Sequence, residues 1–274
     1  MLLAKKIFFI GAGNMGGAIL HALAEDAPHS LSFYEPNDEQ ANRVAEKSKA
    51  EKVISIREGL SKADVVFLCV KPQVFPKISG SLSSLKESGK NLVIVSIMAG
   101  VTLDALRGVF SPQEKDIQIV RAMPNIAVTA KRGTVAIATD GVEESVLREV
   151  EFLFSKCAST ARVLESQMDA VTGLSGSGPA FVFQFIEALA MGGVKMGLPR
   201  DVAIKLALST VSGAAEMLRE SELNPGELTA NVCSPAGTTI AGMQELENRA
   251  FRGTVMAAVE TAAKRSAELG KSSK

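Results

Sequence analysis

The sequence predicts an α/β protein in two parts, a parallel sheet covered by helices and then a region built of helices alone. Up to about residue 165, short apolar runs of strand length alternate with segments of helical periodicity. That alternation is typical of a parallel sheet with helices on both faces. After residue 165 the strand signals vanish, and Ala, Leu, Met and Gly dominate. We therefore predict two domains, residues 1–165 and residues 166–274.

The first domain contains a series of apolar runs that predict strands. The earliest run ends at Gly11 and has the continuous apolar character of a buried parallel strand. In chain order, the predicted strands are 6–10, 31–34, 53–55, 64–70, 91–97, 117–123, 134–139 and 160–164. Helical periodicity between the early runs predicts helices at 14–24, 39–50 and 58–62.

The second domain has helical periodicity throughout. The predicted helices are 177–196, 200–220, 227–233, 239–248 and 254–269. Pro179 and Pro199 fall at or near helix starts, where proline is tolerated. A helical domain this small and apolar cannot cover all of its apolar faces alone. We therefore expect a homodimer formed through these helices, on which a larger homo-oligomer could be built.

Composition narrows the class of protein. The 274 residues are enough for two ordinary domains with real cores. Hydrophobic content of 46% and charged content of 22% are ordinary for a soluble globular protein. Thirty basic residues balance thirty acidic ones, so nothing indicates nucleic acid or an anionic membrane as a partner.

The scarcity of histidine and cysteine restricts the chemistry. Cys69, Cys157 and Cys233 are widely spaced and form no pair typical of a disulfide or redox site, which favours a reducing compartment. The two histidines, His21 and His29, are interpreted as surface residues. Because metal ligation needs His, Cys or carboxylates clustered at defined spacing, we expect no metal site.

Neither a signal peptide nor a membrane span is expected. Residues before the first strand lack the longer apolar segment of a signal peptide. The most apolar helical segment, 180–196, is interrupted by Gln184, Glu187 and Lys195. Its unbroken apolar runs fall short of the roughly 20 residues that cross a bilayer. We expect a cytoplasmic protein.

A glycine-rich turn follows the first strand and opens the first helix. Gly11 permits a tight turn, Gly13 lets the backbone approach a pyrophosphate, and Gly16 lets helix and strand pack closely. The helix N-terminus then stabilises phosphate charge. We therefore predict a Rossmann-type dinucleotide-binding domain. The turn residues predicted to contact the dinucleotide are Gly11, Ala12, Gly13, Asn14, Met15 and Gly16.

Glu35 ends the second predicted strand, 19 residues after Gly16. An acid there can accept hydrogen bonds from the adenosine ribose hydroxyls and repels a 2′-phosphate. No Arg or Lys follows at positions 36–42 to offset that charge. The cofactor is NADH or NADPH, and the residues lean slightly toward NADH.

Three further motifs end the later strands, at the edge where an open parallel sheet binds ligands. They are CVKPQ at 69–73, SIMAG at 96–100 and RAMPN at 121–125. Lys71 can also be interpreted as a strand-end residue that merely precedes a proline, and 123–125 as a simple turn. The residues predicted here to line the nicotinamide are Val70, Lys71, Pro72, Ala99, Met123, Pro124 and Asn125.

The most informative stretch is VCSPAGTTIAGM at 232–243. Small hydroxylated residues surround a Pro and a Gly, and a helical pattern follows at once. A helix start of this kind presents unpaired backbone N–H groups, which suits it to hold a carboxylate. The predicted carboxylate ligands are the hydroxyl of Ser234 and the backbone N–H groups of Gly237, Thr238 and Thr239.

Taken in order, these motifs resemble those of the pyrroline-5-carboxylate reductases. The resemblance covers nearly the whole chain and rests on GAGNMG, VKPQ, MPN, GLSGSGPAF and SPAGTT followed by Phe251-Arg252. It implies reduction of the cyclic imine Δ1-pyrroline-5-carboxylate to L-proline, the last step of proline biosynthesis, by hydride transfer from NAD(P)H. It also implies that Thr239 is the catalytic residue, which hydrogen-bonds the ring nitrogen or helps to deliver a proton. A threonine hydroxyl is a poor acid, so positioning or a water relay is expected.

Two departures from the family pattern stand out. Ala236 occupies a position where the family more often has glycine, and its methyl group costs little if its φ stays negative. The Glu35-Pro36-Asn37 segment lacks the basic residue that many relatives place near the adenosine 2′ position. The second departure leaves the cofactor preference open.

Two other functions remain as alternatives. A β-hydroxyacid dehydrogenase or a broader imine reductase would share the architecture and use a lysine base on the interdomain helix, for which Lys195 and Lys205 are the candidates. A non-catalytic nucleotide sensor would keep the glycine turn and lose the turn at 234–239. The first alternative leaves that turn without a role, and the second is contradicted by its presence.

Overall fold

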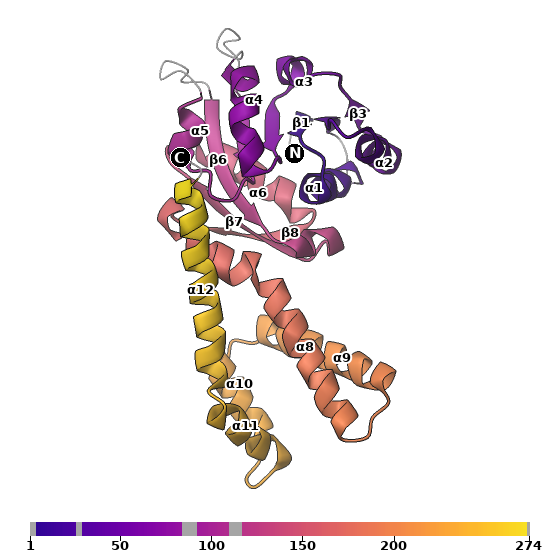
Figure 1. Cartoon of the computed structure of the whole chain (residues 1–274), viewed down its shortest axis with the longest axis vertical. Coiled ribbons are helices and arrows are strands. Elements are labelled where there is room, and N and C mark those ends of the chain that lie inside the picture. Colours follow the sequence, from indigo (N-terminus) through magenta and orange to yellow (C-terminus); the bar gives the residue numbers. More distant parts are fainter. Residues whose placement is uncertain (1–3, 26–28, 84–91, 110–116, 273–274) are drawn as a thin grey trace. The chain divides into compact units, whose positions relative to one another are not determined.

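The computed structural model describes residues 4–25, 29–83, 92–109 and 117–272. Their contacts form two compact units. The first unit is Met1–Ser177 together with Thr261–Lys274, and the second is Gly178–Glu260. Each unit is described by itself below, with the element labels of Figure 1.

The first unit contains an eight-stranded sheet with the order β3-β2-β1-β4-β5-β6-β7-β8. Its strands pair in parallel from β3 through to β6. The strand bounds are β1 Lys6–Ile10, β2 Ser30–Tyr34, β3 Glu51–Lys52, β4 Val65–Leu68, β5 Leu92–Ser96, β6 Ile117–Pro124, β7 Gly133–Thr139 and β8 Ala158–Arg162. The predicted Rossmann-type sheet is therefore confirmed through its first six strands.

The parallel prediction is wrong for β7, which runs antiparallel to β6, while β8 is again parallel to β7. Only residues 125–132 connect β6 to β7, and they contain the 3-10 helix η3, Ile126–Ala130. A parallel crossover needs a dozen or more residues, so a connection this short returns the chain in the opposite direction.

The third predicted strand is also corrected. We expected it at 53–55, but β3 is only Glu51–Lys52. The backbone N–H of Val53 still donates to the Phe33 carbonyl, at 3.0 Å. Ser55 instead caps the following helix, and its hydroxyl accepts from the N–H of Glu58 at 3.2 Å.

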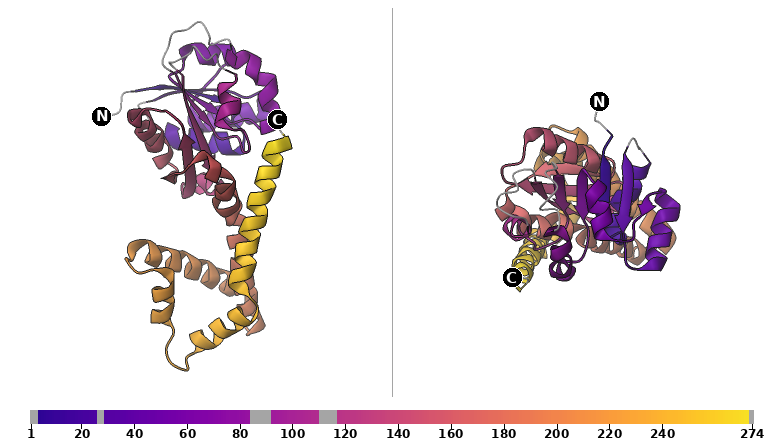
Figure 2. Two further views of the ribbon diagram at one scale, coloured as in Figure 1. Left: turned by 90° about the vertical axis from the view of Figure 1, so that its left-hand side faces the viewer. Right: turned by 90° about the horizontal axis from the view of Figure 1, so that it is seen from above.

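Helices cover both faces of the sheet (Figure 2). Between its strands lie α1 Asn14–Ala24, α2 Asp38–Ser48, α3 Ile56–Lys62, η1 Pro72–Val74, α4 Phe75–Leu82, α5 Leu103–Arg107 and α6 Glu144–Ser155. Alternate residues of β1 face opposite layers of the core, as the period of a strand requires. Phe9 lies in the layer under α1, α2 and α6, and Phe8 in the layer under α3, α4 and α5. In the first layer the rings of Phe9 and Phe67 stack, with centroids 4.7 Å apart.

The chain stays with the sheet beyond residue 165. Short helical segments follow β8, namely η4 Glu165–Gln167, α7 Met168–Val171 and the π-helical turn η5 Thr172–Gly176. Met168 is 1% exposed and packs with Ala136 and Ala138 of β7. By contacts, the first unit therefore extends to Ser177, whereas the sequence placed a boundary after residue 165.

The end of the last helix, α12 Phe251–Ser272, also belongs to the first unit. The hydroxyl of Ser266 donates to the Asp169 carboxylate at 2.7 Å. Gly270 lies against Gly100, where a Cβ on Gly100 would stand 3.2 Å from the Gly270 Cα. Gly100 also has a φ of +76°, which L side chains rarely adopt, so both the close approach and the backbone conformation favour glycine at this position.

The second unit consists of helices only. They are α8 Gly178–Lys195, α9 Arg200–Glu220, α10 Pro225–Val232, α11 Thr238–Asn248 and the first part of α12. Small residues let α8 and α9 pack closely: Ala190, Ala203 and Ala207 are buried between them. Large apolar side chains on this unit are exposed all the same, among them Phe183 at 62% and Met256 at 72%.

By length and composition alone, the helical segment Glu165–Lys195 would pass for a membrane span, and it is the one such segment in the part of the chain that the structure describes. Only 6% of its apolar window is buried within the chain. Apolar helices that a soluble protein buries elsewhere meet the same criterion, so this feature does not by itself indicate a membrane.

Candidate functional site

A cavity of about 360 Å³ opens at the carboxyl ends of β1, β4, β5 and β6. This is the edge at which an open parallel sheet binds its ligands. The cavity brings together residues from motifs that are far apart in the sequence. They are Gly13, Asn14, Met15, Cys69, Val70, Lys71, Ile97, Met123 and Pro124.

The glycine turn has the geometry that the sequence predicted. Gly11 has a φ of +91°, and a Cβ there would lie 2.9 Å from the Cys69 carbonyl oxygen. A Cβ on Gly16 would lie 2.5 Å from the Gly11 carbonyl oxygen, so this position keeps helix and strand together. Gly13 differs from both, because a Cβ there would meet nothing within 4 Å. The open side of the turn is where a ligand can approach the backbone.

The N-terminus of α1 has the features of an anion-binding site. Gly13 is its N-cap residue and offers no side chain to cap the first turn. Within the described residues, the N–H groups of Asn14 and Met15 donate to no protein acceptor. Free N–H groups and the helix dipole together favour a phosphate at this point. The cradle therefore fits the pyrophosphate of a dinucleotide.

The Glu35 carboxylate is fixed in place beside this turn. One oxygen accepts from the N–H of Ala12 at 3.0 Å, and the other from the N–H of Asn37 at 3.1 Å. The Gln40 amide donates to the Ala12 carbonyl at 2.8 Å and ties α2 to the same loop. A negative charge is thus held immobile at the end of β2.

Sequence reasoning missed two residues of this cavity, Cys69 and Ile97. Both lie within motifs of the sequence, but a motif does not reveal that these side chains form part of a cavity wall. Burial raises the pKa of the Cys69 thiol, which therefore stays protonated at neutral pH. Cys69 lies in the cavity wall, where a protonated thiol is a poor nucleophile.

A second cavity of about 570 Å³ lies within the first unit, next to the first. Lys71 and Ile97 line the first cavity, while Pro72 and Ala99 line the second. The two cavities therefore adjoin along the ends of β4 and β5. The other residues of the second are Gln73, Gly100, Thr172, Ser177, Ala262, Arg265, Ser266 and Leu269.

Asn125 does not line either cavity. Asn125 is 8% exposed, and its side-chain NH₂ group donates to the Ser175 backbone carbonyl at 3.1 Å. The side-chain Oδ1 of Asn125 accepts from the N–H of Thr134 at 3.2 Å. Asn125 thus holds the π-helical turn η5 against the β6–β7 connection, next to Met123 of the cavity wall. A π-helical turn often marks a functional site.

The predicted carboxylate turn lies in the second unit, between α10 and α11. Gly237 is the N-cap of α11 and has no side-chain cap. One detail of the prediction is wrong: the Gly237 N–H donates to the Ser234 carbonyl at 3.0 Å and is not free. In the described part of the chain, the N–H groups of Thr238 and Thr239 donate to no protein acceptor. Two of the three predicted amides are therefore open to a ligand.

Ala236 departs from the expectation of a negative φ. Its φ is +57°, in the left-handed region that favours glycine. The reason is local: the Gly237 N–H reaches back to the Ser234 carbonyl, and this tight turn sets the backbone at Ala236. An alanine here is strained where glycine would not be.

Comparison with known proteins identifies relatives along the whole chain. A family model described as pyrroline-5-carboxylate reductase dimerisation matches residues 165–269. A second, described as NADP oxidoreductase coenzyme F420-dependent, matches residues 6–100. The pyrroline-5-carboxylate reductase of Synechocystis is 41% identical over 97% of this chain and 98% of its own length. That of Arabidopsis thaliana is 40% identical over 97% of this chain and 96% of its own length.

Solved structures agree with the sequence relatives. A pyrroline-5-carboxylate reductase from Coxiella burnetii superposes with a TM-score of 0.90 at 29% identity, covering 97% of this chain and 99% of the other. The Plasmodium falciparum pyrroline carboxylate reductase with NADP bound gives 0.84 at 29% identity, covering 97% and 98%. A 3-hydroxyisobutyrate dehydrogenase from Mycobacterium tuberculosis, at 15% identity and a TM-score of 0.54, shares the fold alone.

Proposed function

Because this chain belongs to the pyrroline-5-carboxylate reductase family, we propose how its residues divide the work of reducing Δ1-pyrroline-5-carboxylate to L-proline. The enzyme is an NAD(P)H-dependent oxidoreductase that acts on a C=N bond. The observation that carries the proposal is the pair of open helix N-termini, one beside the glycine turn and one after Ser234. The first suits a pyrophosphate and the second a carboxylate.

The reaction makes modest demands on the protein. The imine carbon of the protonated substrate is already electrophilic, so the protein has to bind and orient it without a strong acid. When bound, the reduced nicotinamide supplies a hydride to that carbon, while the ring nitrogen keeps the proton. Transfer requires the two carbons to be held about 3–3.5 Å apart.

The first cavity is proposed to hold the dinucleotide. The amides of Asn14 and Met15 bind the pyrophosphate, and Glu35 accepts from the adenosine ribose hydroxyls. Val70, Lys71, Met123 and Pro124 form the wall toward the nicotinamide. Pro72 and Ala99 continue that wall into the second cavity. Gly11, Ala12, Gly13 and Gly16 give the turn its shape.

Asn125 is proposed to act through its neighbours. Because its amide is bonded to Thr134 and Ser175, it positions the wall next to the nicotinamide and does not itself contact the cofactor.

The cofactor preference is proposed to be NADH over NADPH by a modest margin. The fixed carboxylate of Glu35 stands where a 2′-phosphate would add like charge. An opposing consideration is that the Plasmodium relative has NADP bound. We therefore propose a small difference between kcat/KM with NADH and kcat/KM with NADPH. Steady-state kinetics with both cofactors measure it.

The turn after Ser234 is proposed to anchor the substrate carboxylate. The N–H groups of Thr238 and Thr239 and the hydroxyl of Ser234 are the donors, while Gly237 shapes the turn. Thr239 is proposed as the catalytic residue, whose hydroxyl hydrogen-bonds the ring nitrogen. Since a threonine hydroxyl is a poor acid, it orients the protonated nitrogen or relays its proton through water.

We further propose that the enzyme is a cytoplasmic homodimer joined through residues 166–274, with residues 1–165 as the dinucleotide-binding domain. The exposed apolar side chains of the second unit support this, and so does the dimerisation family model over residues 165–269. A homodimer interface would cover apolar faces of this kind.

Thr239→Ala tests the assignment of the substrate turn. Turnover is expected to fall at least about tenfold, because a hydrogen bond made in the transition state is lost, while the NADH dissociation constant stays unchanged. Thr229→Ala, in α10 outside the turn, is the matched control. A loss of NADH affinity in the Thr239 variant would place the turn on the cofactor side of the site. Turnover of β-hydroxyacids in place of the imine would favour the dehydrogenase alternative.

A further inference from the structure

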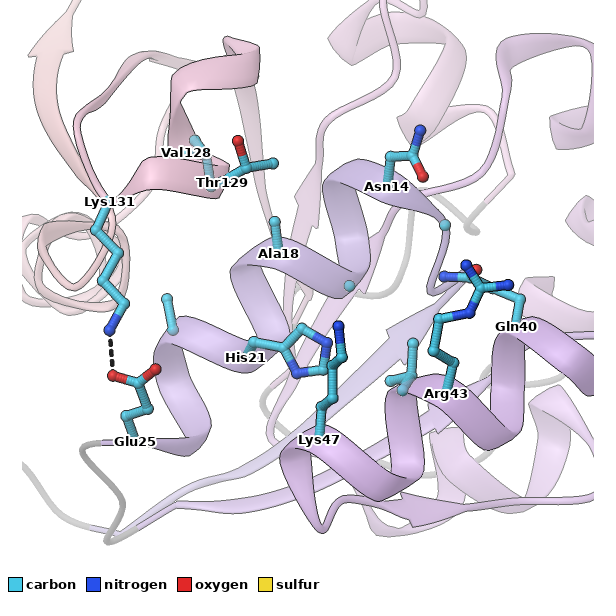
Figure 3. Close-up of a pocket in the computed structure, with 14 residues that line it drawn as sticks. Asn14, Ala18, His21, Glu25, Gln40, Arg43, Lys47, Val128, Thr129 and Lys131 are labelled. Carbon is cyan, nitrogen blue, oxygen red and sulfur yellow. Dashed lines mark hydrogen bonds and ion pairs between the residues drawn. The ribbon is translucent and has the colours of Figure 1, made fainter.

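A groove outside the dinucleotide cavity runs between α1, α2 and η3 (Figure 3). Its volume is about 320 Å³, which lies at the lower end of the range for small-molecule sites. It shares Gly13 and Asn14 with the dinucleotide cavity and otherwise uses different residues. The proposed function does not account for it.

The floor of the groove is made of small and apolar residues. Gly17, Ala18 and Ala22 of α1 lie between Val44 of α2 and Val128 of η3. A Cβ on Gly17 would stand 3.1 Å from the Ala12 carbonyl oxygen, which disfavours a side chain there and keeps this part of the floor flat. A floor of this kind offers apolar contact to a flat organic group.

The rim is basic. Arg43 and Lys47 stand one turn apart on α2, and Lys131 reaches in from the end of η3 (Figure 3). Lys131 is neutralised by an ion pair with Glu25, which lines the same end of the groove (Figure 3). Lys47 has no ion-pair partner among the described residues. Arg43 pairs with Glu39 at 2.9 Å, but Glu39 is 85% exposed and lies outside the groove. Such an exposed pair is weak and yields easily to a better anion.

The pKa of His21 responds to burial and to the charges inside the groove. Burial lowers its pKa most, the nearby Lys47 ammonium lowers it further, and Glu25 acts in the opposite direction. Its Nδ1 is buried and has no hydrogen-bond partner among the residues that the structure describes. Lys131 and Arg43 are the other charged groups that line the groove around the imidazole. Among the described residues, the Lys47 ammonium is therefore the positive charge of the groove that no ion pair balances.

We propose that this groove binds a small organic phosphate monoester, with its phosphate between Arg43 and Lys47 and its organic part on the flat floor. Guanidinium and ammonium groups together suit a phosphate dianion, since Arg binds two of its oxygens and Lys adds a point charge. The apolar floor distinguishes such a ligand from inorganic phosphate, which would gain nothing there. The site adjoins the cavity proposed to hold the dinucleotide and shares only Gly13 and Asn14 with it.

The proximity of the two sites gives the ligand a way to act on catalysis. Gly13 and Asn14 belong to both, so an occupant of the groove touches the turn that receives the pyrophosphate. This consequence rests on the proposed function; binding in the groove does not. An occupied groove is expected to change the KM for NADH and to leave kcat nearly unchanged.

The test is calorimetric titration of AMP into the full-length enzyme saturated with NADH, which fills the dinucleotide cavity. We expect AMP to bind and adenosine to bind at least about tenfold more weakly, because adenosine lacks the phosphate that Arg43 and Lys47 would bind. The double variant Arg43→Gln/Lys47→Gln should weaken AMP binding at least as much. Arg57→Gln, an exposed charge on α3 away from the groove, is the matched control and should leave it unchanged.

Three results would overturn the proposal: no AMP binding by the NADH-saturated wild type, equal AMP affinity in the double variant, or inorganic phosphate binding as tightly as AMP. The NADH dissociation constant of the double variant shows whether it is folded. Activity with the imine substrate tests the proposed function separately, because it does not require the groove.

Discussion

At the scale of single residues, two side chains set properties that the rest of the fold does not. Glu35 carries a charge held by two backbone N–H groups, from Ala12 and Asn37, so the carboxylate cannot turn away from an approaching phosphate. Ala236 carries strain, because its φ of +57° suits glycine. In the proposed function, Glu35 governs which cofactor is preferred, while the strain at Ala236 affects the stability of the turn between α10 and α11.

Glu35→Ser is expected to raise the NADPH to NADH ratio of kcat/KM by about tenfold, because like charges about 4 Å apart near a protein surface repel by more than 1.4 kcal/mol. Steady-state kinetics with both cofactors measure this ratio. Glu46→Ser, an exposed carboxylate on α2 outside both cavities, is the control and should leave the ratio where it is. An unchanged ratio in the Glu35 variant would contradict its assignment to the ribose.

Ala236→Gly is expected to raise the free energy of unfolding by about 0.5–1 kcal/mol, since glycine relieves the left-handed strain but loses more entropy on folding. Denaturant unfolding measures it. Ala230→Gly, inside the α10 helix, is the matched control and should lower stability by about 1 kcal/mol. If both substitutions lower stability equally, the backbone at Ala236 is not strained.

At the scale of elements, the end of α12 is docked on the first unit by contacts that sequence periodicity does not reveal. Ser266 is 7% exposed and donates to Asp169, and Gly270 approaches Gly100. Gly100 lines the second cavity, so the docked helix end supports the loop after β5. Helical spacing predicted the helix, but the partner of Ser266 lies 97 residues away in the chain and that of Gly270 lies 170 residues away.

Ser266→Ala should lower the free energy of unfolding by about 1–3 kcal/mol, because the charged acceptor Asp169 loses its donor. Ser209→Ala, at an exposed position of α9, is the control and should be neutral or slightly stabilising, since alanine favours the helix. Thermal unfolding of both variants gives the comparison. A neutral Ser266 variant would show that this hydrogen bond does not hold the helix end.

The edge strand β8 is tied to α6 by a charged network. Arg162 donates to Glu151 at 2.6 Å and to Glu144 at 2.7 Å. Hydrogen bonds from Arg162 and Arg148 lower the pKa of Glu144 to about 2. The hydrogen bond from Arg162 also lowers the pKa of Glu151. A lowered carboxyl pKa stabilises the fold above the ordinary value of 4.5, and the effect fades as the pH falls toward 2.

Arg162→Gln is therefore expected to lower Tm at pH 7, and the difference from wild type should shrink as the pH falls from 4.5 toward 2. Differential scanning calorimetry over that pH range follows the difference. Arg148→Gln, which removes a more exposed bond to Glu144, should show a smaller effect of the same sign. A Tm difference that stays constant with pH would mean that the network does not act through these carboxylates.

At the scale of the whole molecule, the sequence predicted the architecture because its signals are local. The bounds of β1, α1 and α9 coincide with their predicted ranges, since each has a clear period and a clear end. The direction of β7 was missed, because periodicity identifies a strand but not its partner. The family and its reaction could be inferred from motifs. Each motif is a short run of residues, and the order of the motifs is visible in the sequence without the fold.

The candidate site could be predicted only where a sequence motif exposes backbone N–H groups to a ligand. The glycine turn and the N-terminus of α11 follow from residue type, so both were expected. The role of Asn125 was not, because its partner Ser175 lies 50 residues away and is reached only in the folded chain. The groove between α1, α2 and η3 depends in the same way on packing, which brings Lys131 and Lys47 to the same groove.

The central claim is direct hydride transfer from a bound nicotinamide to the imine carbon, and isotope transfer tests it most directly. The enzyme is given Δ1-pyrroline-5-carboxylate and NADH or NADPH deuterated at C4 on the transferred face. The account predicts L-proline with one deuterium, at C5, as seen by mass spectrometry and NMR. Proline formed without deuterium, or cofactor bound with no proline formed, would contradict it.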